Sequence, residues 1–246
     1  MRYLTTVGTG STRRQIERCV GAGRLRELRP NEPADALGAE RFVAVIADRF
    51  TPLVAADRGI PVLLATQVDR PGLQQFRAFA EAGMDVRVCP MGQEFSEPTM
   101  RRVGAARAPT PAAVIVRETR GMFSGLVVDI VTVAAILGNE RRCMNEIARA
   151  CETTPAGIRN ALRDHGLPTI SGLIARMRCL HALWALESGR TTFWSAAGFR
   201  TLAEVSEFLS RHAGAPLGRW KVPGGFASLM RQVRDGLDAQ RRALVV

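Results

Sequence analysis

The stretch from Cys143 to Lys221 constrains the fold of this chain more than any other part, because it holds two short helix pairs with a long helical segment between them. In each pair a tight turn joins two amphipathic helices, which is the pattern of a helix-turn-helix motif. The second helix of such a motif enters the major groove of DNA, with its N-terminal residues facing the base edges. The stretch therefore predicts an all-helical region that can read two successive grooves.

The first predicted pair has a clearly marked second helix. Ile147 and Cys151 fall on one face of the first helix, and a turn over 152–154 follows. Thr154 suits a helix N-cap, and Pro155 suits the first helical position, where its missing N–H costs nothing. Arg and Asn side chains can make paired hydrogen bonds to guanine and adenine edges. The residues expected to face DNA are Thr154, Ala156, Gly157, Arg159, Asn160 and Arg163.

The second pair follows a long helix predicted over 169–188. It consists of a short helix over 193–197, a turn at Gly198–Phe199 and a second helix over 201–212. The residues expected to point inward from this last helix are Leu202, Val205, Phe208 and Leu209. Those left for solvent or DNA are Arg200, Thr201, Glu204, Glu207 and Arg211. The two glutamates have an alternative role in ion pairs on the helix surface, at helical spacing.

Several motifs of this stretch follow one another in a fixed order. They are Ile147-Ala148, the turn into Pro155, Arg178 with Ala182, Gly198-Phe199, Val205, Phe208-Leu209, Gly214 and Trp220-Lys221. In order and spacing they resemble the DNA-binding domain of AraC/XylS-type bacterial transcriptional regulators. The resemblance implies a double helix-turn-helix fold and regulation of transcription through double-stranded DNA. It also implies RNA polymerase and a second copy of the chain as candidate partners.

Residues 1–95 follow a different pattern, in which short apolar runs alternate with helical segments. The predicted strands are Tyr3–Val7, Leu25–Leu28, Phe42–Ala47, Pro61–Ala65 and Val86–Cys89. The predicted helices are Thr12–Ala22, Asn31–Ala39 and Gly72–Ala82. This alternation predicts βαβ units and a mostly parallel sheet covered on both faces. The expected fold class is therefore an α/β doubly wound domain followed by an all-α double helix-turn-helix domain.

The predicted domain organisation has four parts. They are an α/β regulatory or dimerisation domain over 1–105, a linker over 106–121, a DNA-binding domain over 122–222 and an amphipathic helix over 223–246. The apolar helix over 126–137 is expected to pack on the first helix pair. The apolar stripe of the last helix favours packing on its own domain, with a dimer contact as the alternative.

The order and size of the first domain resemble a response-regulator receiver. Asp48 closes the third predicted strand, where receivers accept phosphate, and Thr66 and Cys89-Pro90 follow the next two strands. The acidic pair that would hold Mg²⁺, a cation that prefers carboxylate oxygens, is replaced by Gly8–Ser11. Since a lysine is also absent at Cys89, phosphoryl transfer to Asp48 would lack charge neutralisation. We expect a degenerate receiver-like module that senses another signal or mediates pairing.

The glycine-containing segment Gly8–Thr12 has two interpretations. It could cradle a phosphate at a helix N-terminus, but Arg13 stands where a dinucleotide fingerprint needs glycine, and no Walker lysine follows. The simpler interpretation is a strand-to-helix turn whose helix is capped by Ser11 or Thr12.

Composition narrows the function classes. The chain carries 34 Lys and Arg against 23 Asp and Glu, a net charge of +11, which favours a polyanionic partner. Residues 111–246 contribute 18 of the basic and 11 of the acidic residues, so the excess lies more in the predicted DNA-binding half. The near-total use of Arg over Lys has an alternative origin in a GC-rich genome.

The five cysteines are scattered, and no cysteine, histidine or carboxylate pattern matches a disulfide framework, a metal site or a catalytic set. No signal peptide or membrane span is visible. We therefore expect a cytoplasmic protein without enzymatic activity, cofactor or metal. Three alternatives remain: an ordinary helical bundle without a DNA role, an α/β enzyme or nucleotide-binding protein, and a scaffold that has lost DNA binding.

Overall fold

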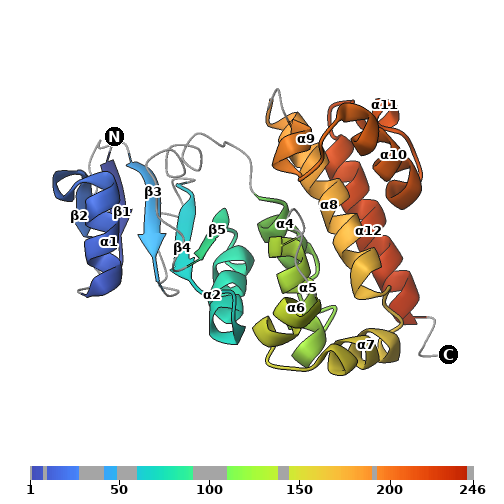
Figure 1. Ribbon diagram of the computed structural model, residues 1–246, viewed down its shortest axis with the longest axis horizontal. Coiled ribbons are helices and arrows are strands. Elements are labelled where there is room, and N and C mark those ends of the chain that lie inside the picture. The colour runs from blue at the N-terminus through green and yellow to red at the C-terminus, as the bar shows by residue number, and fades with distance from the viewer. Residues whose placement is uncertain are drawn as a thin grey trace. The chain divides into compact units, whose positions relative to one another are not determined.

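The computed structural model of the chain describes residues 2–7, 10–27, 42–48, 60–90, 110–137, 144–189 and 193–242. The chain divides into two compact units, residues 1–113 and 114–246 (Figure 1). Their boundary falls within the segment 106–121 that the sequence assigns to a linker. Part of that segment is helical: α4 spans Pro111–Glu118, and its first six residues are buried.

The first unit is built on a five-stranded parallel sheet. Its strands are β1 (Arg2–Thr5), β2 (Leu25–Glu27), β3 (Phe42–Ala47), β4 (Val62–Thr66) and β5 (Val86–Pro90). They lie in the order β2-β1-β3-β4-β5, and every neighbouring pair is parallel. The five predicted strands and the parallel sheet are therefore confirmed. An all-parallel sheet needs cover on both faces, which agrees with the uninterrupted apolar character of β4.

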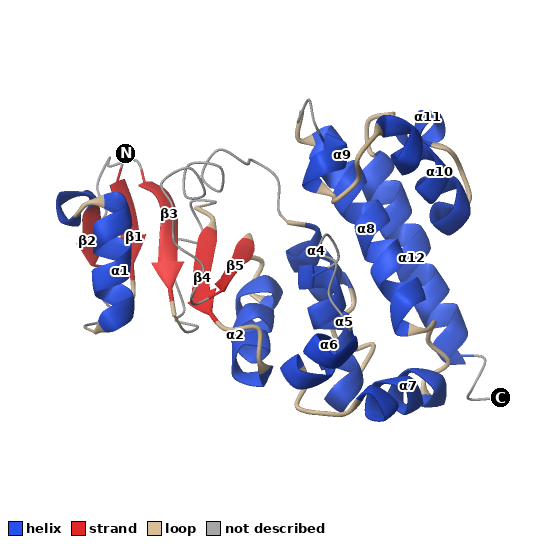
Figure 2. Cartoon of the chain, in the orientation of Figure 1, coloured by secondary structure: helices blue, strands red, loops and turns tan. Residues whose placement is uncertain are grey.

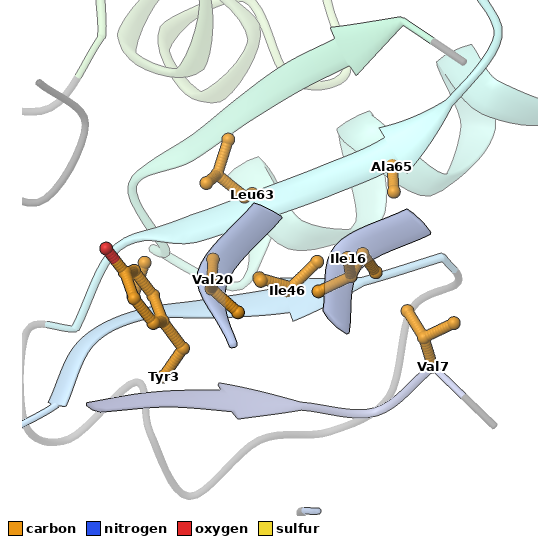
Figure 3. Packing of buried hydrophobic residues seen from close by; sticks show 8 residues of the cluster. Tyr3, Val7, Ile16, Val20, Ile46, Leu63 and Ala65 are labelled. Atoms are coloured by element: carbon orange, nitrogen blue, oxygen red, sulfur yellow. The ribbon is translucent and has the colours of Figure 1, made fainter. Parts of the chain in front are cut away.

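Helix α1 (Ser11–Val20) covers one face of this sheet and leads through a short 3₁₀ turn, η1 (Ala22–Arg24), into β2. Figure 3 shows Ile16 and Val20 of α1 lying over Ile46 and Leu63 of the sheet, and all four side chains are buried. Side chains alternate along a strand, so the buried neighbours of Leu63 in β4 face the other side of the sheet.

The start of α1 corrects one prediction. The N-cap of the helix is Gly10, not Ser11 or Thr12, and the φ of Gly10, 126°, is in the region that favours glycine. Gly8 and Thr9, the other half of the predicted phosphate cradle, lie outside the described residues.

Helix α2 (Arg70–Glu81) joins β4 to β5 and matches the predicted helix over 72–82. It begins where the Asp69 carboxylate accepts a hydrogen bond from the Gly72 N–H at 2.9 Å, and it buries Phe76 and Phe79. The remaining predicted helix of this unit, Asn31–Ala39, lies outside the described residues.

The second unit is helical throughout its described part (Figure 2). After α4 come α5 (Gly125–Leu137), α6 (Met144–Ala150), α7 (Pro155–Asp164), α8 (Ile170–Glu187), α9 (Phe193–Ala196), α10 (Leu202–Ala213), α11 (Leu217–Trp220) and α12 (Gly225–Arg242). The α/β first region and helical second region expected from the sequence are therefore confirmed.

Helix α8 is the centre of this unit. It contacts α5, α7, α9, α10 and α12, and ten of its residues are buried. The strongly apolar α5 packs on α6, α7 and α8, as predicted, and His181 of α8 makes a 2.8 Å hydrogen bond with the Ala135 carbonyl oxygen of α5. Among the described residues, no helix combines the length and the apolar character needed to cross a membrane.

The last helix, α12, packs on its own unit. Its buried stripe of Leu229, Met230, Val233 and Leu237 matches the predicted one, and it contacts α8 and α11. The Glu187 carboxylate, at the end of α8, accepts a hydrogen bond from the Phe226 N–H at 2.8 Å. Glu118 of α4 forms a 3.1 Å ion pair with Arg234. These contacts confirm that the helix packs on its own unit.

Candidate nucleic-acid interface

The first helix pair consists of α6, a turn over 151–154 and α7. Its turn is fixed by hydrogen bonds from the Cys151 N–H to the Ile147 carbonyl oxygen and from the Thr153 N–H to the Ala148 carbonyl oxygen, at 3.0 and 2.9 Å. Glu152 takes a left-handed conformation with φ of 51°. Non-glycine residues reach this conformation at a cost of about 1–2 kcal/mol, so the turn is held by the packing around it.

Helix α7 begins as the sequence predicts. The Thr154 hydroxyl accepts a 3.0 Å hydrogen bond from the Gly157 N–H, and Pro155 occupies the first helical position. Gly157 leaves room for its neighbour, since a Cβ at this position would overlap the Oγ1 atom of Thr153. Gly157 is therefore placed to shape the start of α7, next to the side chains that face solvent.

One face of α7 is buried and the opposite face is exposed. Ile158 and Leu162 are the buried residues. Four residues of α7 predicted to face DNA are exposed, and Arg159 and Asn160 each lie three or four positions from the other two: Ala156, Arg159, Asn160 and Arg163. This spacing places them on one side of the helix. Gly157, predicted with them, is half-buried. Arg163 lies 3.3 Å from the Asp164 carboxylate, but both side chains are more than 60% exposed, so the ion pair contributes little stability.

The second helix pair consists of α9, a turn over 197–201 and α10. Here Thr201 is the N-cap, and its hydroxyl accepts a 3.1 Å hydrogen bond from the Glu204 N–H. In return the Glu204 carboxylate accepts a 2.8 Å hydrogen bond from the Arg200 N–H. This reciprocal arrangement resembles a capping box and satisfies two amides at the helix start. Half-buried Glu204 thus has a role within its own helix.

Arg178 of α8 holds the turn of this second pair. Its Nε donates to the Ala197 carbonyl oxygen at 3.2 Å and its Nη2 to the Gly198 carbonyl oxygen at 2.7 Å. The same guanidinium lies 4.1 Å from the ring centroid of Phe199 and 5.2 Å from that of Phe208. Arg178 therefore connects the central helix to the end of α9, to the turn and to α10. The sequence marks Arg178 only through the family resemblance, because these partners lie nineteen and more residues away.

The residues of α10 that were predicted to point inward do so with one exception. Val205 and Leu209 are buried and Phe208 is half-buried, as expected for inward residues. Leu202 was expected to point inward, and this is wrong: the side chain is 46% exposed. Leu202 shares the face of Val205 and Leu209 by its spacing, but as the first residue of α10 it lies where that buried face ends at the start of the helix.

The structure also shows where the charged side chains of α10 lie. Glu207 and Arg211 form a 2.6 Å ion pair at i,i+4 spacing, and both side chains are about two-thirds exposed. This is the surface pairing that the sequence offered as the alternative role of Glu207. Arg200 and Thr201, at the start of the helix, are exposed as well. His212 packs its ring 4.4 Å from that of Phe208, and its pKa is lowered by desolvation and by the neighbouring Arg211.

In the first unit, Asp48 directly follows β3 and is exposed, and Thr66 is the last residue of β4. Cys89 belongs to β5. Parallel strands end at a common edge, so these positions occupy the edge that the receiver resemblance implies. In the described parts of the chain, no group of three or more His, Cys, Asp or Glu side chains could hold a metal ion.

Comparison with known proteins gives no further identification: no protein-family model matches this chain, and no curated protein or solved structure gives a significant match.

Proposed function

We propose that this protein is a bacterial transcriptional regulator that binds double-stranded DNA in a sequence-specific manner through α7 and α10. The observation that carries the proposal is common to both helices. Each begins at a threonine N-cap after a tight turn, buries one face in its unit and leaves the side chains near its start in solvent. A helix that enters the major groove needs this combination of a fixed backbone and an open N-terminal face.

The two pairs then act as helix-turn-helix motifs on one support. Helix α8 has 18 residues, which corresponds to about 27 Å at 1.5 Å per residue. Figure 1 shows α7 and α10 toward opposite ends of α8. Successive major grooves on one side of a duplex are about 34 Å apart, so a support of this length suits a protein that reaches two of them.

The exposed residues divide into two proposed roles. Arg159 and Asn160 of α7 would contact base edges, because their side chains can form the paired hydrogen bonds that distinguish guanine and adenine. Arg163, Arg200 and Arg211 would contact phosphates, as would the capped helix starts at Thr154 and Thr201. Glu204 stays in its helix cap.

The first unit would regulate DNA binding or pair two copies of the chain. Its strand order agrees with the receiver resemblance, and the degenerate phosphorylation site favours a signal other than phosphate transfer to Asp48. RNA polymerase and a second copy of the chain are proposed partners on the same grounds, and the cytoplasm is the proposed compartment.

Selection of genomic fragments with the purified full-length chain tests the proposal. The expected result is enrichment of a bipartite sequence that binds at least about a thousandfold more tightly than random duplex at a fixed salt concentration, the lower end for specific binders. Equal binding of selected and random duplex would contradict sequence-specific regulation. No binding at all would favour a scaffold that has lost DNA binding.

A second candidate function concerns the first unit alone. Its strand order reverses between β1 and β3, and parallel sheets bind ligands at the carboxyl ends of the strands beside such a reversal. A small ligand bound there would make this unit a sensor or an enzyme. Melting curves of the full chain with a panel of nucleotides test this candidate, since a ligand that binds the folded state raises the melting temperature.

A further inference from the structure

Leu202, the first residue of α10, has an exposed side chain. Among the residues that the structure describes, Leu202 and Val222 are the large hydrophobic side chains that are exposed, at 46% and 52%. A leucine left in water gives up the stabilisation that its burial would provide. At the start of a proposed reading helix, this apolar side chain is available for a contact with a partner.

The backbone around Leu202 is held firmly. Thr201, directly before it, accepts a hydrogen bond from the Glu204 N–H, and Glu204 binds the Arg200 N–H in return. These two bonds enclose Leu202 between them. Val205 and Leu209, three and seven residues further along the same face of α10, are fully buried, so Leu202 lies where this buried face reaches the exposed start of the helix. The exposure of Leu202 is thus built into the helix start.

The surroundings indicate which partner fits. Arg200, Thr201 and Ala203 are exposed next to Leu202, so the start of α10 presents one cation, one hydroxyl and two apolar side chains. The major groove offers acceptors for the first two, and for an apolar side chain it offers the 5-methyl group of thymine. A phosphate or a sugar hydroxyl would give Leu202 no favourable contact.

We propose that Leu202 packs against a 5-methyl pyrimidine in the target duplex, namely a thymine, and so makes that base pair a determinant of specificity. This inference rests on the proposed function, because it requires α10 to enter the major groove. It adds a contact that hydrogen bonding by the arginines of the two helices cannot make.

The test uses the selected duplex and the full chain. Each thymine is replaced in turn by deoxyuridine, which removes only the 5-methyl group, and affinity is measured by fluorescence anisotropy at fixed salt. Wild-type protein is expected to lose about fourfold in affinity at one thymine, the equivalent of one buried methyl group. Leu202→Ala is expected to bind the thymine and deoxyuridine duplexes equally and to keep its affinity for random DNA.

Val222→Ala is the matched control, since it shortens the other exposed hydrophobic side chain, which lies outside the proposed reading helices. This variant should retain the wild-type response to deoxyuridine. A further arm places cytosine or 5-methylcytosine at the sensitive position. Restoration of affinity by methylation of the cytosine shows that the protein reads the 5-methyl group in either pyrimidine.

Two results would overturn the inference. They are a wild-type protein that is insensitive to every deoxyuridine, and a Leu202→Ala variant with the same sensitive position as wild type. Both require that the selected duplex binds better than random DNA. If it does not, the proposed function itself fails, so the two failures are distinguished.

Discussion

The guanidinium of Arg178 lies 4.1 Å from the ring centroid of Phe199 and donates hydrogen bonds to the two carbonyl groups, of Ala197 and Gly198, that precede this ring. One side chain of the central helix thus holds the backbone and the aromatic ring of the same turn. Because the orientation of α10 follows from this turn, the position of the second proposed reading helix depends on Arg178.

Replacement of Arg178 by Met should therefore lower the free energy of unfolding by about 2 kcal/mol, since hydrogen bonds to a charged donor contribute about 1.5–3 kcal/mol. Arg178→Lys should retain only part of the free energy of unfolding that Arg178→Met loses, because lysine cannot present a planar pair of donors to two carbonyl groups. Urea unfolding measures both effects. Arg176→Met, two residues earlier in α8, is the matched control. An equal loss in the two methionine variants would contradict a special role of Arg178.

Replacing either of two glycines in equivalent positions by alanine should change the free energy of unfolding, but in opposite directions. Gly157 and Gly172 each donate an N–H to a threonine N-cap three residues earlier. A Cβ at Gly157 would overlap the Thr153 side chain, whereas a Cβ at Gly172 would meet only ordinary contacts of 3.4 Å and more. Gly172→Ala should raise the free energy of unfolding by about 0.5–1 kcal/mol through helix propensity, and Gly157→Ala should lower it.

Thermal melting followed by circular dichroism compares these two variants directly. Gly157→Ala should also weaken DNA binding, because it shifts the start of α7. Stabilisation of similar size in both variants would show that the start of α7 is not constrained by Thr153.

The regular elements of this fold are predictable from the sequence for local reasons. Thr154-Pro155 and Thr201 mark helix starts because capping depends on residues that are neighbours in the chain, and the apolar runs of β3 and β4 mark buried strands. Local sequence patterns do not predict the exposure of Leu202 or the partners of Arg178. Leu202 has the spacing of an inward residue but lies at the end of its helix, where the buried face stops, and the partners of Arg178 lie nineteen and more residues away in the chain. The cap of α1 was missed for a different reason: Gly10 adopts a conformation that the sequence does not specify.

Cys179 should be unreactive in the folded protein. Burial raises the pKa of its thiol to about 12, so almost no thiolate is present at neutral pH. Half-buried Cys19 should be alkylated faster. Brief treatment with iodoacetamide at pH 8, followed by mass spectrometry of each cysteine peptide, measures the two rates.

The same thiol should make the stability of the protein depend on pH in alkaline solution. A folded-state pKa above the ordinary value of 9.0 means that the unfolded chain loses this proton first as pH rises. The free energy of unfolding should therefore fall between about pH 9 and 12, and Cys179→Ala should remove part of this decline. Fast alkylation of Cys179 at pH 8 would contradict the buried environment that both expectations require.

Arg159 should contribute to specificity. Its exposed side chain lies on the outer face of α7 beside Asn160, near the helix start. Arg159→Ala should cost about 1–3 kcal/mol on the selected duplex and much less on random DNA, as expected for a base contact. Arg231→Ala, which removes another exposed arginine, from α12, is the matched control for the loss of one charge. An equal loss on both duplexes would reassign Arg159 to a phosphate contact.

Arg211 should behave differently, because its position toward the end of α10 favours a phosphate contact. Each phosphate contact contributes about 0.9 to the slope of log affinity against log salt concentration. Arg211→Ala should flatten that slope by about this amount on selected and random duplex alike. In the free protein Arg211 is paired with Glu207 at 2.6 Å, so DNA must compete with this carboxylate. Glu207→Gln should therefore raise affinity without flattening the slope. A slope unchanged by Arg211→Ala, together with an affinity unchanged by Glu207→Gln, would place this end of α10 away from the DNA backbone.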